Sequence, residues 1–465
     1  MELMPEFDLN IERVLEHWLP AHAVRELIAN ALDEAALTNS REPEIAKDSE
    51  GIWHIRDHGR GLRYEHLTQK ENREKLARTD LVGKFGVGLK DALATFERRK
   101  IRIEIESRHH RMILVRAAKH GFTDVKTLHV LVEPATNPVM VGTDVRLQGI
   151  ADSAIEEAKE MFLRYAGDEV LERTPHGSVL QRTKQGPARI YVNGLRVAEE
   201  ENFLFSYDVT SLSAALRRAL NRERTNVGRT AYTDRVKAIL LAAQSSEVAN
   251  PLAADLEGFA SGRLHDENQW LDVAFHACQV LNASEKVIFL TAREIEMAAS
   301  FVEHARDDGR RVIAVPEDLR RKLAGATDIT GRPMIDLARY AADWNDSFTF
   351  NYVDEADLTE AERKLFSRTG EIIALRGKRP RDLKGVRISE TMRLEFGQEI
   401  VAVWDPRTGE IVIRRDQLSA LAHYAGTLLH EVAHAETGTP DISASFEQAL
   451  TEALGVVAVR ALGRE

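Results

Sequence analysis

The stretch AVRELIANALDEAAL, residues 23–37, decides how the first part of this chain is interpreted. Apolar residues recur in it at positions 24, 27, 28, 31, 32 and 35, a spacing that predicts a helix with one buried face. Glu26, Asn30 and Asp33 are spaced i, i+4 and i+7, so they form one row on that helix. Such a row beside an apolar stripe is suited to lining a groove, although a solvated polar face has the same pattern.

Two glycine-rich segments follow the predicted helix. WHIRDHGRGL, residues 53–62, alternates like a strand and then turns, with Asp57 at the strand end and Gly59 and Gly61 in the turn. A carboxylate in this place can accept a hydrogen bond from an exocyclic amine, while glycines allow a flat ring to approach the backbone. The segment thus predicts contacts to a planar ring that carries an amine.

LVGKFGVGLKDAL, residues 81–93, is the second of these segments, and it leads from a loop into a helix. The loop contains Gly83, Gly86 and Gly88, and Lys90 lies in the first turn of the predicted helix. The free N–H groups of a helix N-terminus can hold phosphate, and the lysine adds a positive charge. The segment therefore predicts a phosphate site.

In order and spacing, the three segments resemble those of the GHKL ATPases, the class that includes gyrase, heat-shock chaperones, histidine kinases and MutL. ELIANALDE is similar to the N-box of that family, DHGRG to its first glycine box and GKFGVGLK to its second. Gly142 and Thr143, in VGTDVRL, resemble the strand element that closes the adenine pocket. The resemblance implies an α/β sandwich ATPase domain over residues 1–150, closest to the MORC and MutL types, with a lid at about 62–82.

Carried over residue by residue, the resemblance implies ATP and Mg²⁺ as cofactors. Glu26 corresponds to the general base that activates the attacking water, and Asn30 to the ligand of Mg²⁺. Asp57 is expected to accept a hydrogen bond from the adenine amino group, with support from Thr143. Asp33 is expected to shape the nucleotide pocket.

Residues 151–248 are expected to form a second domain. DSAIEEAKEMFLRYA predicts a helix, and IYVNGLRV predicts a strand interrupted by the turn signal Asn193-Gly194. In MutL-like and MORC-like proteins, a ribosomal-protein-like transducer follows the ATP domain, and a lysine in one of its loops reaches the γ-phosphate. Lys184 lies in the corresponding loop and is the expected nucleotide contact from this domain.

Residues 249–345 are expected to form a small α/β domain. KVIFLTA, REIEMAASFVEHARDDG and RRVIAVP predict a strand, a long helix and a second strand, which indicates a parallel pair. No phosphate loop or catalytic cluster is present in this part of the sequence. A spacer or partner-binding domain is the interpretation.

The last part of the chain contains a motif typical of zinc hydrolases. EIVAVWDPRTGEIVIRR, residues 399–415, predicts a hairpin, and the helix after it is expected to begin near Asp416 and to stop at Gly438. HEVAH in this helix places His430 and His434 on one face, as two zinc ligands require, with Glu431 beside the metal-bound water. Zinc lowers the pKa of that water from about 15.7 to near 7, so a carboxylate can take its proton. A core helix with two incidental histidines is the alternative.

The third zinc ligand is expected on the following helix, DISASFEQALTEALGVVAV. Glu447 flanks the predicted apolar face of this helix, whereas Glu452 points nearly to the opposite side. Glu447 is therefore preferred to Glu452, although the choice stays open. The arrangement resembles the gluzincin metallopeptidases, which implies an α+β zincin-like domain over residues 346–465.

Composition limits the classes of function. A chain of 465 residues is too long for one hydrophobic core, and 43% hydrophobic with 29% charged residues is ordinary for a globular protein. The single Cys278 excludes an internal disulfide framework and a cysteine-based zinc site. Apolar runs are too short to span a membrane and no signal peptide is evident, so a cytoplasmic location is expected. A net charge of −11 argues against extensive nucleic-acid binding but allows a local basic face.

Together these features predict an ATP-regulated zinc endopeptidase that acts on protein or peptide substrates. The resemblance implies that ATP closes the lid and drives homodimerisation of the N-terminal domains. A role in stress response or phage defence would suit a protease that must be controlled. The alternative is a MORC-like or MutL-like ATP-driven DNA clamp with a non-proteolytic C-terminal domain. A chaperone-like protein that binds clients without cleaving them is a third possibility.

Overall fold

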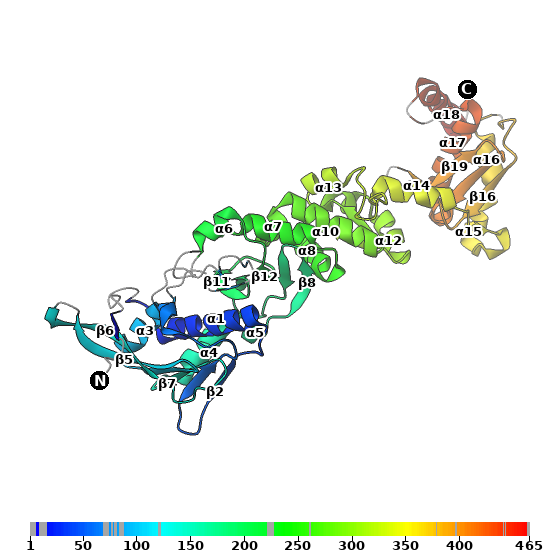
Figure 1. The fold of residues 1–465 in the computed structure, drawn as a ribbon. Coiled ribbons are helices and arrows are strands. Elements are labelled where there is room, and N and C mark those ends of the chain that lie inside the picture. Colours follow the sequence, from blue (N-terminus) through cyan, green and yellow to red (C-terminus); the bar gives the residue numbers. More distant parts are fainter. Residues whose placement is uncertain are drawn as a thin grey trace. The chain divides into compact units, whose positions relative to one another are not determined.

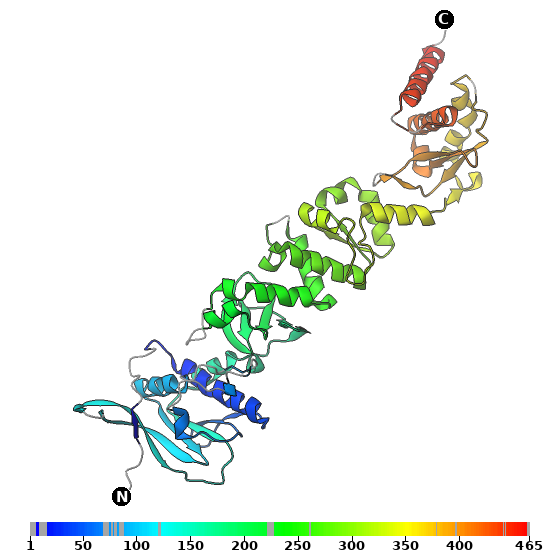
Figure 2. The ribbon, with the colours of Figure 1, turned by 45° about the horizontal axis from the view of Figure 1, so that its top comes forward.

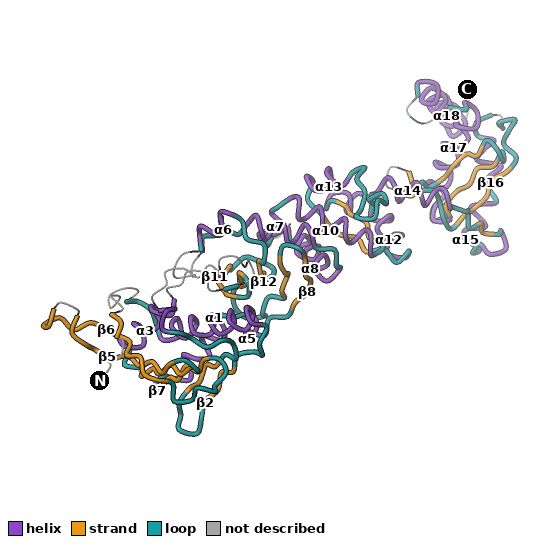
Figure 3. The backbone as a smooth tube through the Cα atoms, viewed as in Figure 1, coloured by secondary structure: helices purple, strands orange, loops and turns teal. Residues whose placement is uncertain are grey.

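The chain folds as a mixed α/β multidomain protein, as the sequence predicts (Figures 1, 2 and 3). The computed structural model divides into two compact units, residues 1–280 and residues 281–465. Among the described residues, no helix is both long enough and apolar enough to cross a bilayer. The structure describes the chain except for residues 1–5, 9–15, 68–73, 76–77, 79–80, 83–87, 120–121, 221–226, 260–261, 378, 396–397, 440, 442 and 463–465.

A seven-stranded sheet forms one layer of the N-terminal part of the first unit (Figure 2). Its strand order is β1-β6-β5-β4-β7-β3-β2, and all neighbouring pairs are antiparallel. The strands are β1 (Glu6–Asp8), β2 (Glu44–Lys47), β3 (Trp53–Arg56), β4 (Arg102–Ser107), β5 (His110–Lys119), β6 (Phe122–Pro134) and β7 (Thr143–Gln148).

Helices cover one face of this sheet, because alternate strand residues are apolar. Ile103 and Ile105 of β4 are buried in the core shared with the helices, whereas Glu104 between them bonds to Arg111 and Arg146 on the other face. The helix predicted from residue 23 is confirmed as the first of these helices, and its apolar stripe is buried. The helices are α1 (Pro20–Thr38), α3 (Gly88–Arg98) and α4 (Asp152–Glu160), and a short 3-10 turn spans Tyr64–Leu67.

A five-stranded sheet with the order β11-β10-β12-β9-β8 follows in the same unit. Only the pair of β10 and β12 is parallel. The predicted turn joins β10 to β11, and both of its residues have positive φ, 49° at Asn193 and 78° at Gly194, which is the conformation that an Asn-Gly hairpin favours. The strands are β8 (Val170–Thr174), β9 (Gly177–Leu180), β10 (Ala188–Val192), β11 (Leu195–Glu200) and β12 (Ser206–Val209).

The chain from residue 249 to residue 280 still belongs to the first unit. In α9, the buried carboxylate of Glu267 accepts hydrogen bonds from the backbone of Leu204 at 2.8 Å and from the hydroxyl of Tyr207 at 2.8 Å. These bonds tie α9 to β12, so the expected boundary at 248/249 falls inside a compact unit. The helices are α5 (Leu163–Ala166), α6 (Ala214–Ala219), α7 (Thr233–Ala242), α8 (Ser246–Glu257), α9 (Asp266–Gln269) and α10 (Leu271–Ser284), with a 3-10 turn at Arg229–Ala231.

The second unit begins with the predicted parallel pair. β13 (Val287–Leu290) and β14 (Arg311–Ala314) pair in parallel, which confirms the strand–helix–strand prediction. The single long helix expected between them is instead divided at Ala298, where φ is −118° and ψ is 44°. The helices are α11 (Ala292–Met297), α12 (Ala299–Asp307), α13 (Glu317–Leu323) and α14 (Leu337–Ser347).

A four-stranded sheet with the order β15-β16-β20-β19 forms the C-terminal part of the second unit. The predicted hairpin is confirmed as the antiparallel pair β19–β20. β20, the strand immediately before the HEVAH helix, lies between β16 and β19, and β19 is at one edge of the described sheet. The strands are β15 (Tyr352–Val353), β16 (Gly385–Ser389), β19 (Ala402–Asp405) and β20 (Glu410–Arg414), and β17 (Leu394–Glu395) pairs separately with β18 (Gln398–Glu399).

The HEVAH helix packs its apolar residues onto this sheet. Tyr424, Leu428 and Val432 are fully buried there. The helix begins at Leu421, later than Asp416, because a 3-10 turn intervenes, and it ends before Gly438, whose φ of 63° gives the predicted left-handed cap. The helices are α15 (Glu360–Phe366), α16 (Thr369–Ala374), α17 (Leu421–Thr437) and α18 (Ala444–Leu462), with 3-10 turns at Glu355–Asp357 and Arg415–Ser419.

Candidate functional site

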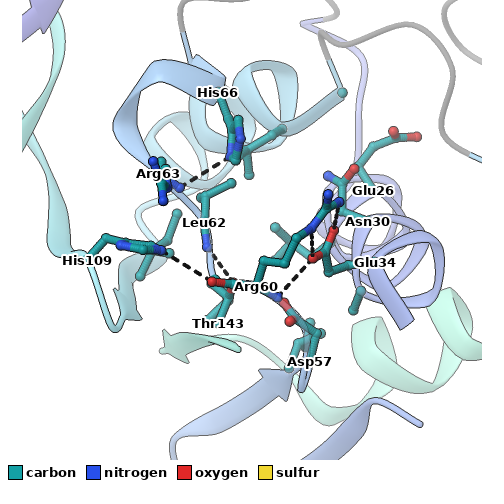
Figure 4. A pocket seen from close by; sticks show the side chains of 18 of the residues that line it. Glu26, Asn30, Glu34, Asp57, Arg60, Leu62, Arg63, His66, His109 and Thr143 are labelled. Atoms are coloured by element: carbon teal, nitrogen blue, oxygen red, sulfur yellow. Dashed lines mark hydrogen bonds and ion pairs between the residues drawn. The ribbon is translucent and has the colours of Figure 1, made fainter. Parts of the chain in front are cut away.

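A pocket of about 640 Å³ lies in the first unit, between α1, the turn after β3 and the start of α3 (Figure 4). This volume is in the usual range for pockets that hold small molecules. The apolar side chains of its lining give a flat ring a surface to pack on. The predicted site residues that line the pocket are Glu26, Asn30, Asp57, Gly61, Gly88 and Thr143. Its apolar lining residues are Leu27, Ala31, Ile55, Leu62, Leu89, Ile105 and Val145.

Asp57 lies at the end of β3 and is only 7% exposed. Its Oδ1 accepts a hydrogen bond from the backbone N–H of Gly59 at 2.9 Å, and its carboxylate also bonds to the hydroxyl of Thr143. The Thr143 hydroxyl in turn accepts from the backbone N–H of Leu62 at 3.0 Å. Burial raises the pKa of Asp57, although these bonds oppose the rise. The predicted pair of Asp57 and Thr143 is therefore brought together, with the carboxylate at the pocket wall.

Two glycines around this pair have no room for a side chain. Gly142 has a φ of 82°, and a Cβ there would lie 1.9 Å from the carbonyl oxygen of Asp57. Gly59 does not line the pocket, but a Cβ on it would lie 2.4 Å from Cγ of Glu34. The glycines thus allow the turn after β3 to approach both β7 and α1.

Glu26 lies beside the start of α3. Its carboxylate accepts a hydrogen bond from Arg25 at 2.9 Å, and both side chains are almost completely buried. A Cβ on Gly88 would lie 2.1 Å from Oε2 of Glu26, so the glycine lets this carboxylate come close to the start of α3. The carboxylate that the resemblance assigns as the general base therefore faces the positive end of a helix dipole.

Asn30 and Asp33 contact a lysine that the sequence analysis did not single out. Nζ of Lys75 lies 3.2 Å from Oδ1 of Asn30 and 2.9 Å from Oδ2 of Asp33. The other carboxylate oxygen of Asp33 accepts from the backbone N–H of Val82 at 2.8 Å. Asp33 does not line the pocket but connects α1 to the segment expected to be the lid, whereas Asn30 and Lys75 line the pocket.

Arg60 forms a second connection across the pocket mouth (Figure 4). Its guanidinium bonds to both carboxylate oxygens of Glu34, at 2.9 and 3.0 Å, and to Glu74 at 2.9 Å. Burial raises the pKa of Glu34, but the bonds from Arg60 outweigh it, so the pKa is lowered overall. This group was not predicted from the sequence, although Glu34 lies one helical turn after Asn30 and so continues the predicted polar row.

Neither of the two lysines predicted to contact the nucleotide lines the pocket. Lys90 is half-buried in the first turn of α3 but is not among the lining residues. Lys184 is exposed in the loop between β9 and β10 and does not line the pocket. The lysine that contacts α1 is Lys75. Gly83 and Gly86 lie outside the described residues.

A second group of polar side chains lies in the second unit. His430 and His434 of α17 meet Asp441, which follows the helix, and the three residues offer ligand atoms within 4.8 Å of one another. Nδ1 of His434 donates to the carbonyl oxygen of Thr439 at 2.8 Å. Burial lowers the pKa of His430 more than Asp441 raises it, which favours the neutral imidazole that metals bind. Glu431 is 6% exposed.

Neither glutamate expected as the third zinc ligand belongs to this cluster. Glu447 and Glu452 are exposed on α18, and the residue that α18 directs at the histidines is Phe446, which stacks on His434 with ring centroids 4.1 Å apart. Successive helical residues are rotated by about 100°, so Glu447 cannot face the same way as Phe446. The carboxylate instead comes from Asp441, in the turn that Gly438 begins.

Fold and pocket together define a multidomain α/β protein with a cavity of small-molecule size in its N-terminal unit. The family model described as Mycoplasma pneumoniae MPN635 N-terminal domain matches residues 153–246, which include the five-stranded sheet. An uncharacterized protein of Mycoplasma pneumoniae is 37% identical over 243 residues, covering 51% of this chain and 97% of that protein. The chain therefore belongs to the family of this Mycoplasma protein. A second uncharacterized Mycoplasma pneumoniae protein is 28% identical over 160 residues, 34% of this chain and 44% of that protein.

Proposed function

We propose that this protein is an ATP-regulated zinc endopeptidase, in which a GHKL-type pocket binds Mg²⁺ and ATP and controls a C-terminal metal-dependent hydrolase. One observation carries the proposal: residues far apart in the sequence converge on one pocket. These residues are Glu26, Asn30, Asp57 and Thr143.

The ring of ATP would bind between the apolar side chains of the pocket, against the turn after β3. The carboxylate of Asp57, which bonds to the hydroxyl of Thr143, would accept a hydrogen bond from the exocyclic amine. Gly61, with a φ of 86°, lets the turn pass close to the ring. Because Asp57 is buried, its hydrogen bond to the amine is made without competition from water.

The phosphates would lie toward the start of α3, where free backbone N–H groups and the helix dipole favour an anion. Oδ1 of Asn30 is an oxygen donor of the kind that Mg²⁺ prefers, so the residues present fit the ion. Bound Mg²⁺ would neutralise phosphate charge. Glu26, beside Gly88, would take the proton of the attacking water.

Replacement of Glu26 tests the first half of the proposal. Glu26→Gln should keep ATP binding but lower hydrolysis by about 10²–10⁴, the usual effect of losing a general base. Calorimetry measures the binding, and phosphate release measures the hydrolysis. Glu106→Gln is the matched control, because Glu106 is equally buried, at 1% exposed, but does not line the pocket, and it should hydrolyse normally. Hydrolysis at the wild-type rate in Glu26→Gln would remove the assignment of the base.

The hydrolase half of the proposal is supported by α17 and the hairpin before it. His430 and His434 present their Nε2 atoms to one point, 3.2 Å apart, which fits a shared metal ion. A zinc ion bound there would lower the pKa of its water, and Glu431 would accept that proton. In the described part of the sheet, β19 is at the edge and packs against α17, so an extended peptide has a strand to pair with.

Cleavage of an unstructured protein tests this half. Glu431→Gln should retain zinc, because its carboxylate acts on water, but should lose cleavage by at least about 10². Glu452→Gln, an exposed acid on α18, is the control and should cleave normally. Zinc-free protein that is retained on DNA in the presence of ATP would instead favour the clamp.

ATP binding is further proposed to produce a dimer. Lys75 and Glu74 connect the expected lid to α1 and to Arg60, so a nucleotide among these residues would change the position of the lid. Light scattering should show a doubled mass with Mg²⁺ and ATP, most clearly for Glu26→Gln, which cannot turn the nucleotide over. An unchanged mass in the presence of bound ATP would contradict the dimer.

A further inference from the structure

We propose that Asp441 is the third protein ligand of a catalytic zinc ion, together with His430 and His434, and that the fourth position is open to water. The inference rests on the proposed zinc site and specifies its ligands. It replaces a ligand from the next helix by one from the turn directly after α17.

The distances within the cluster form a nearly regular triangle. Nε2 of His430 and Nε2 of His434 are 3.2 Å apart, and Oδ1 of Asp441 lies 3.1 Å from the first and 3.2 Å from the second. With zinc bonds of about 2.0–2.2 Å, two ligand atoms at a tetrahedral angle are separated by about 3.3–3.5 Å. A single ion above this triangle would therefore meet all three atoms after small adjustments.

The hydrogen bonding of His434 leaves its Nε2 suited to a cation. Its Nδ1 faces the carbonyl oxygen of Thr439, which can only accept, so Nδ1 carries a proton. In a neutral ring Nε2 then has only a lone pair, and this lone pair points at a carboxylate oxygen and at a second imidazole nitrogen. A bound cation would turn this repulsive arrangement into a favourable one. A histidine ligand is usually oriented by a carbonyl oxygen that accepts a hydrogen bond from its other ring nitrogen, as Thr439 does here.

The local backbone explains how Asp441 reaches the histidines. Gly438 adopts a left-handed conformation with φ 63°, which ends α17 and reverses the chain. The hydroxyl of Thr439 then donates to the hydroxyl of Thr437 at 3.0 Å, which holds the turn against the helix end. A carboxylate three residues after the cap is thereby returned to the helix face that carries the histidines.

The exposure of the three ligands indicates an open site. The Asp441 side chain is 61% exposed and that of His430 is 39% exposed, whereas His434 is covered by Phe446. Structural zinc sites have four protein ligands and are closed, while catalytic sites have three and leave a position for water or substrate. Three ligands with an exposed edge, and Glu431 next to His430 in the sequence, correspond to the catalytic kind.

Zinc affinity of the full-length chain tests the assignment. Purified variants are stripped with a chelator, reloaded, and titrated against a chromophoric chelator of known affinity. Wild type is expected to hold one zinc ion, and Asp441→Asn to bind it at least about 10-fold more weakly. Glu447→Gln and Glu452→Gln should bind like wild type. Asp441→His should recover affinity, because imidazole is also a zinc ligand, which a merely structural carboxylate would not explain.

A cobalt-substituted sample supplies a readout that is independent of stability. The visible absorption of Co²⁺ should change in Asp441→Asn and remain unchanged in Glu447→Gln, because only the first alters the coordination. Normal affinity in Asp441→Asn with loss in Glu447→Gln would overturn this inference while preserving the zinc site. A wild-type protein that binds no zinc would overturn the proposed hydrolase as well, so the two failures are distinguishable.

Discussion

The two candidate sites are built in opposite ways. The N-terminal pocket takes its lining residues from α1, the end of β3, the start of α3 and the start of β7, among other segments, between residues 26 and 145. The C-terminal cluster takes all three of its side chains from one segment, His430–Asp441. The pocket therefore requires a completed sheet with its helices, whereas the cluster requires one helix end and the turn after it.

The two sites also differ in burial, because the acidic side chains of the pocket are buried and Asp441 of the C-terminal cluster is exposed. Glu26 and Asp57 in the pocket are 3% and 7% exposed, so replacing them affects the stability of the fold as well as the ligand contacts. Asp441 in the cluster is exposed, and its replacement should change metal binding with little effect on folding. Each variant of a pocket residue therefore needs a control variant in which an equally buried residue outside the pocket is replaced.

The largest effect is expected for Asp57→Asn, which should weaken ATP binding by about 100-fold or more through loss of a buried charged acceptor. Asp208→Asn is a matched control, since Asp208 is also buried and accepts a backbone hydrogen bond, from Gly194 at 2.8 Å, but does not line the pocket. Calorimetry with ATP checks both. Equal affinity for ATP in the two variants would show that Asp57 does not bind the adenine ring.

A smaller effect on ATP affinity is expected for Lys75, and none is expected for Lys184. Lys75→Ala should weaken ATP binding about tenfold, because it removes the ammonium group that lines the pocket beside Asn30. Lys184→Ala should leave the affinity unchanged, since Lys184 is exposed away from the pocket. The reverse order would mean that the loop between β9 and β10 moves to the phosphates when ATP binds, as the family resemblance implied.

The smallest effects concern stability against pH, and they should have opposite signs in the two units. Burial raises the pKa of Asp57, so its contribution favours folding below its unfolded pKa of 3.8 and is lost as pH rises through its folded pKa. Asp57→Asn should therefore gain a few degrees in melting temperature relative to wild type between pH 4 and pH 7. A constant difference would contradict the burial of the charge.

Glu362 should behave in the opposite way. Bonds from Arg415 lower the pKa of Glu362 from 4.5 to about 2, so its stabilising contribution is present above pH 4.5 and is lost as pH falls toward 2. Glu362→Gln should thus be less stable than wild type at pH 7, with a difference that disappears in acid. Thermal melts at several pH values measure both variants.

Local signals explain the elements that the sequence predicted. The stripe in α1, the Asn193-Gly194 turn and the cap at Gly438 each depend on a few neighbouring residues, and all three are confirmed. The parallel pair of β13 and β14 could also be inferred, because a strand, a helix and a strand in succession favour it.

Most of the site contacts that the sequence did not predict are made between side chains that lie far apart in the sequence. Arg60 meets Glu74, and Lys75 meets Asn30, through a segment that has no periodic pattern of its own. The sequence predicted the third member of the His430–His434 group on the following helix, because the faces of a helix can be calculated from residue spacing. Asp441 instead follows a glycine turn, and a helical wheel does not give the direction of such a turn.

The central claim is that nucleotide in the pocket controls hydrolysis at the metal cluster, and one measurement tests it directly. Cleavage of casein by the zinc-loaded full-length chain should be compared with and without Mg²⁺ and ATP, for wild type and for Asp57→Asn. The account predicts that ATP changes the wild-type rate several-fold and leaves the variant unaffected. A wild-type rate that is the same with and without ATP, under conditions where ATP is bound, would contradict it.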